Sequence, residues 1–117
     1  MRIVGEYIEE FNTLTGQSLT CDHIFQSDGL RIHIAKRHPD CVALLHDIPL
    51  ILSEPDYIGC NPNEAANVEL VKCLDNNLMV CVKLDQSKGY LYVATLFKIS
   101  NAKLQNRLKS GRLKKFG

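Results

Sequence analysis

The sequence concentrates four polar side chains suited to phosphoryl transfer in one short segment: His33, Lys36, Arg37 and His38. If this segment is helical, Lys36 and Arg37 follow His33 by three and four residues and share one face with it. An imidazole can accept a proton near neutral pH, and two fixed cations can stabilise a phosphorane-like transition state. The alternative is an ordinary solvated helix face that ends in a capping His38. The spacing alone leaves both interpretations open.

Thr95 is a second candidate, because it is a hydroxyl residue in an apolar, strand-like run over residues 90–99. Simple alternation would place it in one row with apolar neighbours, namely Leu91, Val93, Phe97 and Ile99. A buried hydroxyl needs a hydrogen-bonding partner, which could be a substrate phosphate or a backbone group of a neighbouring strand. Lys83, in the preceding strand-like run, is a similar but less supported candidate.

A metal site is a third possibility, since His38, Cys41 and His46 follow a His-x2-Cys-x4-His spacing, with His33 and Asp40 nearby. That spacing is not a recognised zinc pattern, so we expect no metal. The five cysteines are an odd number without a CxxC pair, which disfavours a disulfide scaffold and indicates a reducing, cytoplasmic setting. No phosphate-binding, dinucleotide-binding or hydrolase motif occurs, and no cofactor is expected.

The charges are distributed unevenly along the 117 residues. Residues 98–117 carry +7 and no acid, whereas residues 1–97 carry −6. A basic end on a near-neutral chain indicates binding to phosphate or to an acidic protein, and a solvated terminal helix is the alternative. Arg112, Lys114 and Lys115 are therefore candidates for contacting an RNA backbone. Tryptophan is absent and only eight aromatic residues are present, which leaves little for a base-stacking platform.

Helical spacing dominates the first half of the chain. It predicts a helix over residues 4–14 that stops at Gly16, and a helix over residues 27–37, although Leu30, Ile32 and Ile34 also alternate like a strand. Pro39 favours a new helix start near residue 38, continuing with a further turn or two over residues 48–52. Between the first two helices, residues 19–25 lean towards a strand.

The second half predicts an antiparallel meander over residues 68–74, 78–84 and 90–99, joined by short polar turns. Residues 101–116 should be helical at least at first. Helices followed by a meander indicate an α+β fold, with N-terminal helices packed on a curved antiparallel sheet in a single domain of residues 1–117. No apolar run is long enough to cross a membrane, and the acidic N-terminal segment is unlike a signal peptide.

One segment carries a resemblance to a known family. Residues 29–40, which read GLRIHIAKRHPD, resemble the His-Ile-x-x-Arg-His-Pro signature of the phage barnase–EndoU–colicin–RelE-like nuclease domains (PBECR). Four later segments are similar to that family as well. They are IPLIL and EPDYI, the aromatic strand YLYVATLF and the basic end LKSGRLKKF. The resemblance covers residues 29–116. The strand departs from the family at Val93-Ala94-Thr95, where a serine–isoleucine run is commoner.

The resemblance implies a barnase/EndoU/RelE-like fold and metal-independent cleavage of RNA through a 2′,3′-cyclic phosphate. It implies that His33 and His38 act as the acid–base pair, that Arg37 and Lys36 hold the scissile phosphate, and that Thr95 contacts phosphate from the sheet. RNA is then the expected partner, together with an antitoxin or immunity protein. A non-catalytic nucleic-acid- or protein-binding module and a phage structural accessory protein are the competing interpretations.

Overall fold

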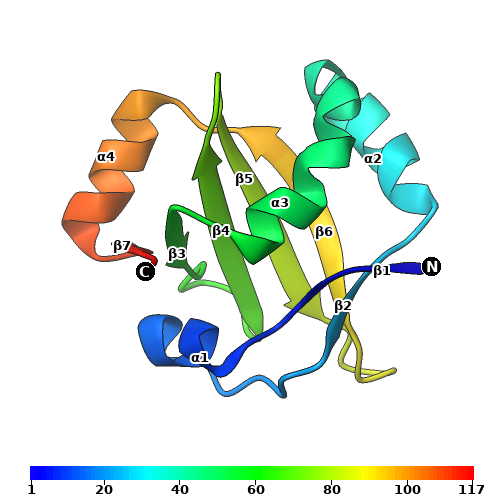
Figure 1. Ribbon diagram of the computed structural model, residues 1–117, viewed down its shortest axis with the longest axis horizontal. Helices are drawn as coiled ribbons and strands as arrows, with labels where there is room; N and C mark the ends of the chain where they lie inside the picture. Colours follow the sequence, from blue (N-terminus) through cyan, green and yellow to red (C-terminus); the bar gives the residue numbers. More distant parts are fainter.

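The computed structural model describes residues 1–117 as a seven-stranded mixed sheet with helices against it (Figure 1). The elements follow one another as β1 (Arg2–Glu6), α1 (Glu9–Thr15), β2 (His23–Gln26), α2 (Gly29–Arg37), the 3₁₀ helix η1 (Pro39–Asp47), α3 (Ile48–Ser53), β3 (Tyr57–Gly59), β4 (Asn67–Cys73), β5 (Asn77–Leu84), β6 (Leu91–Lys98), α4 (Asn101–Ser110) and β7 (Leu113–Lys115).

The strands are ordered β1-β2-β6-β5-β4-β3-β7, so the two ends of the chain form opposite edges of the sheet. All neighbours are antiparallel except β2 and β6, which are parallel. The predicted α+β fold is therefore confirmed, and the predicted meander is its centre, β4-β5-β6. Four further strands flank that meander. Of these, β2 overlaps residues 19–25, which were predicted to lean towards a strand, whereas β1, β3 and β7 were not predicted.

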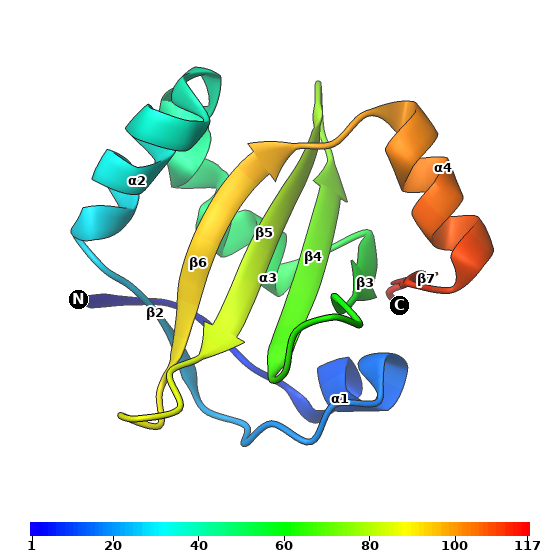
Figure 2. The ribbon, with the colours of Figure 1, turned by 180° about the vertical axis from the view of Figure 1, so that it is seen from behind.

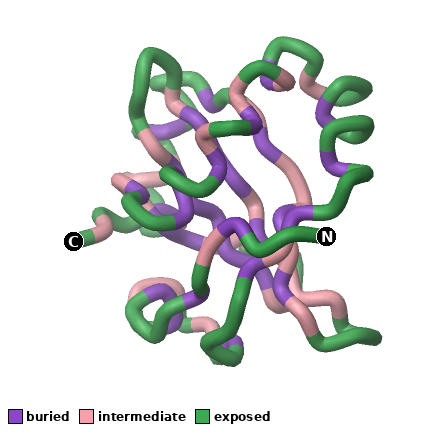
Figure 3. Tube along the Cα trace, turned by 45° about the vertical axis from the view of Figure 1, so that its right-hand side comes forward, coloured by how far each residue is buried: buried purple, intermediate pink, exposed green.

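One face of the sheet carries the main core. Helices α2, η1 and α3 contribute apolar residues such as Ile34, Leu45 and Ile51, which pack with buried residues of the central strands. Figure 1 shows α3 crossing in front of these strands, and Figure 3 shows the buried stretches running along them. The reverse face is exposed to view in Figure 2, where no helix crosses the middle of β4, β5 and β6. We call this reverse side the open face.

Helix α4 covers only one end of the open face. Its Leu104 packs with Val71, Met79, Ile99 and Leu113 in a small second core. The centre of the open face thus lies between α2 at one side and α4 at the other, as Figure 2 shows. Side chains that point out of the sheet there are free to form a site.

The predicted helix over residues 4–14 is wrong at its start, because Arg2–Glu6 is strand β1 and the helix begins only at Glu9. Gly5 disfavours a helix and lets α3 approach β1 closely, since a Cβ there would lie 2.9 Å from Leu52 Cδ1. The helix does stop at Gly16, whose φ of 77° is the left-handed cap expected of glycine. The helix predicted up to Arg37 and the new helix start at Pro39 are confirmed by α2 and η1.

Residues 101–116 begin as a helix, as predicted, but α4 stops at Ser110 and the chain turns back at Gly111 into β7. β7 pairs with β3, and this close approach needs Gly59, because a Cβ at that position would lie 1.7 Å from the Arg112 carbonyl oxygen. Leu113 is buried and Phe116 packs edge-on against Phe11. The basic end is therefore an integral edge of the sheet.

Candidate functional site

A β-bulge at Ala94 aims Thr95 at the open face. Cys81 of β5 pairs with Thr95, while the next residue, Val82, pairs with Val93, so Ala94 has no partner in the ladder. Strand bulges of this kind shift the side-chain alternation by one residue and are frequent beside active sites. Leu91, Val93 and Leu96 consequently face the main core, and Thr95 does not. The predicted apolar row containing Leu91, Val93 and Thr95 is wrong for this reason.

Helix α2 places His33 over this strand. Leu30 and Ile34 bury one side of the helix in the main core, which leaves His33 exposed. The His33 Nε2 atom lies 3.3 Å from Thr95 Oγ1, at the long end of hydrogen-bonding distances. Two residues that the sequence analysis singled out separately, 62 positions apart, are thus brought into contact.

His38 lies beside them, at the end of α2. Its backbone leaves helical geometry with φ −141° and ψ 64°, and Pro39 starts η1 immediately after it. The imidazole stacks on the ring of Phe97, with a centroid separation of 5.4 Å and an interplanar angle of 27°. Since Phe97 follows Thr95 by two residues on β6, both imidazoles lie at the same end of the open face.

An ion pair fixes η1 relative to β6. The Lys98 Nζ atom lies 3.1 Å from Asp40 Oδ2. This hydrogen bond from Lys98 lowers the pKa of the Asp40 carboxyl below its ordinary value. Because Asp40 follows His38 by two residues, the contact holds the end of α2 close to the strand that carries Thr95. Lys98 belongs to the basic end but is neutralised by this pair.

A cavity of about 250 Å³ opens on the same face, next to Thr95 and Phe97. Strands β4, β5 and β6 form its floor, and α4 and the segment before β7 supply two arginines. Its lining residues are Asn61, Glu64, Asn67, Glu69, Cys81, Lys83, Thr95, Phe97, Arg107 and Arg112. Three cationic side chains and two carboxylates line it, so its formal charge is positive.

Glu69 is the buried acid of this cavity, with a side chain only 5% exposed. Arg112 donates two hydrogen bonds to it from one edge of the guanidinium, Nε to Oε1 at 2.8 Å and Nη2 to Oε2 at 2.7 Å. Arg107 approaches the same carboxylate, with Nη1 3.7 Å from Oε2. The hydrogen bond to Glu69 raises the pKa of Arg112 above its ordinary value. Glu69 thus orients Arg112 and leaves the Nη1 group of that residue without a hydrogen bond.

Lys83 also lies in the cavity and is paired. Its Nζ atom is 2.9 Å from Glu64 Oε2, and this hydrogen bond raises the pKa of the lysine. Both side chains of the pair are more than one third exposed. The contact is therefore weak and can exchange for another anion. Lys83 remains available to a ligand at little cost.

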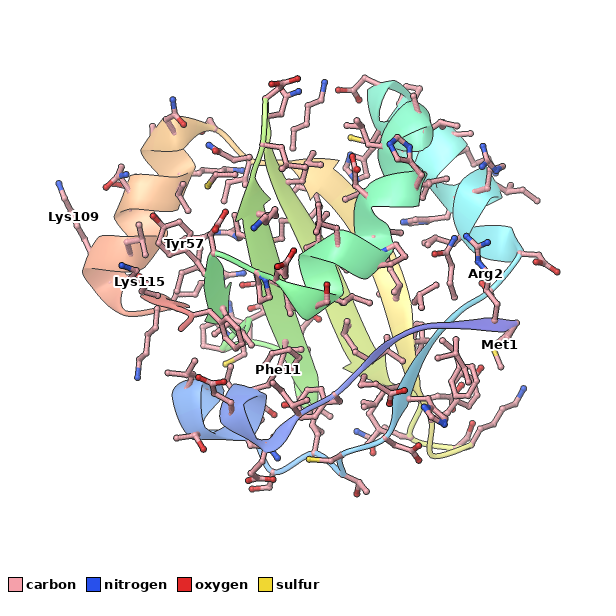
Figure 4. All side chains as sticks on the ribbon, in the orientation of Figure 1. Met1, Arg2, Phe11, Tyr57, Lys109 and Lys115 are labelled. Carbon is pink, nitrogen blue, oxygen red and sulfur yellow. The ribbon has the colours of Figure 1, made fainter.

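The other predicted binding residues are not brought to the cavity. Lys36 and Arg37 are exposed on the last turn of α2 and make no ion pair. Lys114 lines a separate cavity of about 410 Å³ on the far side of Arg112, between α1 and β7. Lys115 is exposed and lines neither cavity. Figure 4 shows Lys109, another base of this end, extending away from the molecule.

Among the residues of the site that were not proposed from the sequence as functional are Glu69, Arg107 and Phe97. Glu69 did leave a signal, because it is a charged residue within the apolar run Val68–Val71 of a central strand. A carboxylate at such a position requires a cationic partner. The sequence could not identify that partner, since Arg112 lies 43 residues further along.

Candidate metal ligands do not converge. No three His, Cys, Asp or Glu side chains are grouped closely enough to hold a metal ion. The five cysteines are all free thiols, and burial raises the pKa of Cys81, in the cavity floor, to about 12. No helix has both the length and the apolar character needed to span a membrane.

Comparison with known proteins gives one result. A family model described as phage-Barnase-EndoU-ColicinE5/D-RelE like nuclease3 matches residues 2–106. The match includes the segment from β1 to β2, and it ends within α4, so that Arg112, Lys114 and Lys115 lie beyond it. No curated protein and no solved structure matches the chain.

Proposed function

Because the chain belongs to the phage-Barnase-EndoU-ColicinE5/D-RelE like nuclease family, we propose that it is an endonuclease that cleaves RNA at the cavity beside His33 and Thr95. The observation that supports this most is the convergence of two imidazoles and a hydroxyl at the rim of a positively charged cavity. A phosphodiester carries one negative charge, which such a lining complements. Toxin or prophage activity is the biological setting that we infer from the family.

In the proposed reaction, the ribose 2′-hydroxyl attacks the adjacent phosphorus. One imidazole accepts the proton of that hydroxyl, and the other donates a proton to the departing 5′-oxygen. The P–O5′ bond breaks as the P–O2′ bond forms, which leaves a 2′,3′-cyclic phosphate and a free 5′-hydroxyl. His33 and His38 perform the two proton transfers, and the reaction needs no redox partner.

The negative charge on the phosphate is stabilised from the sheet and from the opposite wall of the cavity. Thr95 donates its hydroxyl hydrogen to a phosphate oxygen from the sheet. Arg112 presents its free Nη1 group from the other wall of the cavity, where Glu69 holds it. Lys83, also on the sheet, exchanges its contact with Glu64 for the phosphate. Arg37 and Lys36 lie outside the cavity on the last turn of α2, so their proposed role is to bind the RNA backbone where it leaves the cavity. Lys114 and Lys115 contribute to longer-range attraction of the RNA backbone.

The decisive experiment is digestion of single-stranded RNA in the presence of EDTA, with analysis of the product ends. We expect 2′,3′-cyclic phosphates and 5′-hydroxyls. A preparation of the His33→Ala/His38→Ala double variant controls for contaminating ribonucleases. Cleavage that stops in EDTA or yields 5′-phosphates would contradict the mechanism. Binding without cleavage would favour a non-catalytic module, and neither binding nor cleavage would favour a structural accessory protein.

Thr95→Val should lower kcat/KM for RNA cleavage by about tenfold, the value of one lost hydrogen bond to the phosphate. Valine keeps the β-branched shape, so the free energy of unfolding should change by less than about 1 kcal/mol. Thr95→Ser, which keeps the hydroxyl, is the matched control and should retain most activity. If the valine variant is as active as the wild type per folded molecule, Thr95 does not contact the substrate.

A further inference from the structure

Three aromatic residues of the open face form a continuous cluster next to the cavity. They are Phe25 of β2, Tyr92 of β6 and Tyr90, which immediately precedes β6. The ring centroids of Phe25 and Tyr90 are 5.9 Å apart at 86°, and those of Tyr90 and Tyr92 are 6.1 Å apart at 63°. These edge-to-face contacts join the three rings without stacking one on another.

The register places this cluster on the same side of the sheet as Thr95. Ile24 pairs with Leu91, and both are buried in the main core. The next residues, Phe25 and Tyr92, also pair with each other and therefore point to the opposite, open face. All three aromatic side chains of the cluster are partly exposed there, whereas the core aromatics Tyr7 and Phe11 are only 2% and 1% exposed.

The cluster also adjoins the cavity directly. Tyr92 lies opposite Lys83 in the β5–β6 ladder, and Lys83 lines the cavity. Tyr92 and Thr95 are three residues apart on one strand, which corresponds to about 10 Å or less. The cluster therefore lies on the β2 side of the cavity, whereas Arg112 lies on the β7 side.

A partly exposed aromatic cluster beside a positively charged cavity has the two components of a single-stranded nucleic-acid site: rings for the bases and cations for the backbone. We propose that Phe25, Tyr90 and Tyr92 form a stacking platform for nucleobases of single-stranded RNA next to the scissile phosphate. The inference rests on the proposed function and identifies its substrate class. Stacking of this kind tolerates any base, because every base has a π face.

The test uses 2′-O-methyl RNA oligonucleotides, which lack the attacking hydroxyl and so remain uncleaved by the wild-type protein. Affinity is compared between a full oligonucleotide and a series in which one base at a time is removed to leave an abasic site. We expect loss of the stacked base to weaken binding by about 5- to 150-fold. Removal of bases that do not touch the platform should change the affinity by less than twofold.

The variant Tyr92→Leu tests the platform from the side of the protein. This substitution should weaken binding of the full oligonucleotide by about tenfold. It should leave binding of the sensitive abasic oligonucleotide almost unchanged, because that oligonucleotide already lacks the base that stacks on Tyr92. Tyr92→Phe should restore the affinity. Tyr57→Leu, an equivalent change on β3 away from the platform, is the matched control and should bind both RNAs like the wild type.

Each outcome separates the platform from the nuclease activity. If no abasic position matters in the wild type, or if Tyr92→Leu weakens both RNAs equally, the platform is overturned even when RNA is cleaved. If the abasic effect is present but native RNA is not cleaved, the platform stands and the proposed nuclease function fails. The abasic series on the wild-type protein keeps the test valid if Tyr92→Leu does not fold.

Discussion

Replacing His33 or His38 with alanine should lower the rate of RNA cleavage by a factor of about 10² to 10⁴, the usual contribution of a general acid or base. Each imidazole is proposed to move one proton, so neither can compensate for the other. His33 is exposed, and its loss should change the free energy of unfolding by less than about 0.5 kcal/mol. His38 also stacks on Phe97, so His38→Ala should cost about 1 kcal/mol of stability in addition.

The measurement is an initial rate on a defined oligonucleotide, paired with thermal unfolding of each variant. His46→Ala is the matched control, because the His46 side chain is 76% exposed on η1 and its ion pair is with the neighbouring Asp47. It should cleave RNA at the wild-type rate. Wild-type activity in either His33→Ala or His38→Ala would remove that residue from the mechanism.

Glu69→Gln should be the most destabilising isosteric substitution in the cavity, lowering the free energy of unfolding by about 2–4 kcal/mol. The change removes the only carboxylate that neutralises Arg112 and Arg107, whose side chains are 24% and 19% exposed. Two cations would then face each other beside a neutral amide that can accept fewer hydrogen bonds. Because Arg112 would lose its orientation, cleavage should fall as well.

Urea unfolding measures this effect, and Glu64→Gln provides the comparison. The pair of Glu64 with Lys83 has side chains that are 44% and 38% exposed, so its loss should cost less than about 1 kcal/mol. A Glu69→Gln/Arg112→Gln double variant should be less unstable than the sum of the single variants. If Glu69→Gln and Glu64→Gln lower the free energy of unfolding equally, the buried ion pairs of Glu69 stabilise the fold no more than the exposed pair of Glu64.

Local signals predicted the parts of the fold that depend on nearby residues. Pro39 determined a helix start, Gly16 determined a helix stop, and the alternating runs of the second half determined β4, β5 and β6. Strands β1, β3 and β7 were missed, because each has only three to five residues and exists through pairing with distant segments. Short edge strands of this kind have little periodicity of their own.

The candidate site was predictable in its residue types but not in its geometry. His33, His38 and Thr95 were singled out by chemistry and spacing, and they do come together. The sequence counts charges without showing which are paired, so Arg112 was interpreted as a free cation, although it donates two hydrogen bonds to Glu69. Sparse aromatics argued against a stacking platform, because composition does not reveal that three of them gather on one face.

The bulge at Ala94 has a consequence for how β6 tolerates change. If every residue of β6 is replaced in turn, polar substitutions should destabilise the protein at Leu91, Val93 and Leu96, and should be tolerated at residues 94 and 95. A strand without a bulge would show the reverse at the end of this series, with a sensitive residue 95 and a tolerant residue 96. Thr95 and Leu96 are adjacent in the chain, but Leu96 is buried in the main core, whereas the role proposed for Thr95 is contact with the substrate. Substitutions at Thr95 can therefore remove its proposed function while the contribution of β6 to the core is maintained.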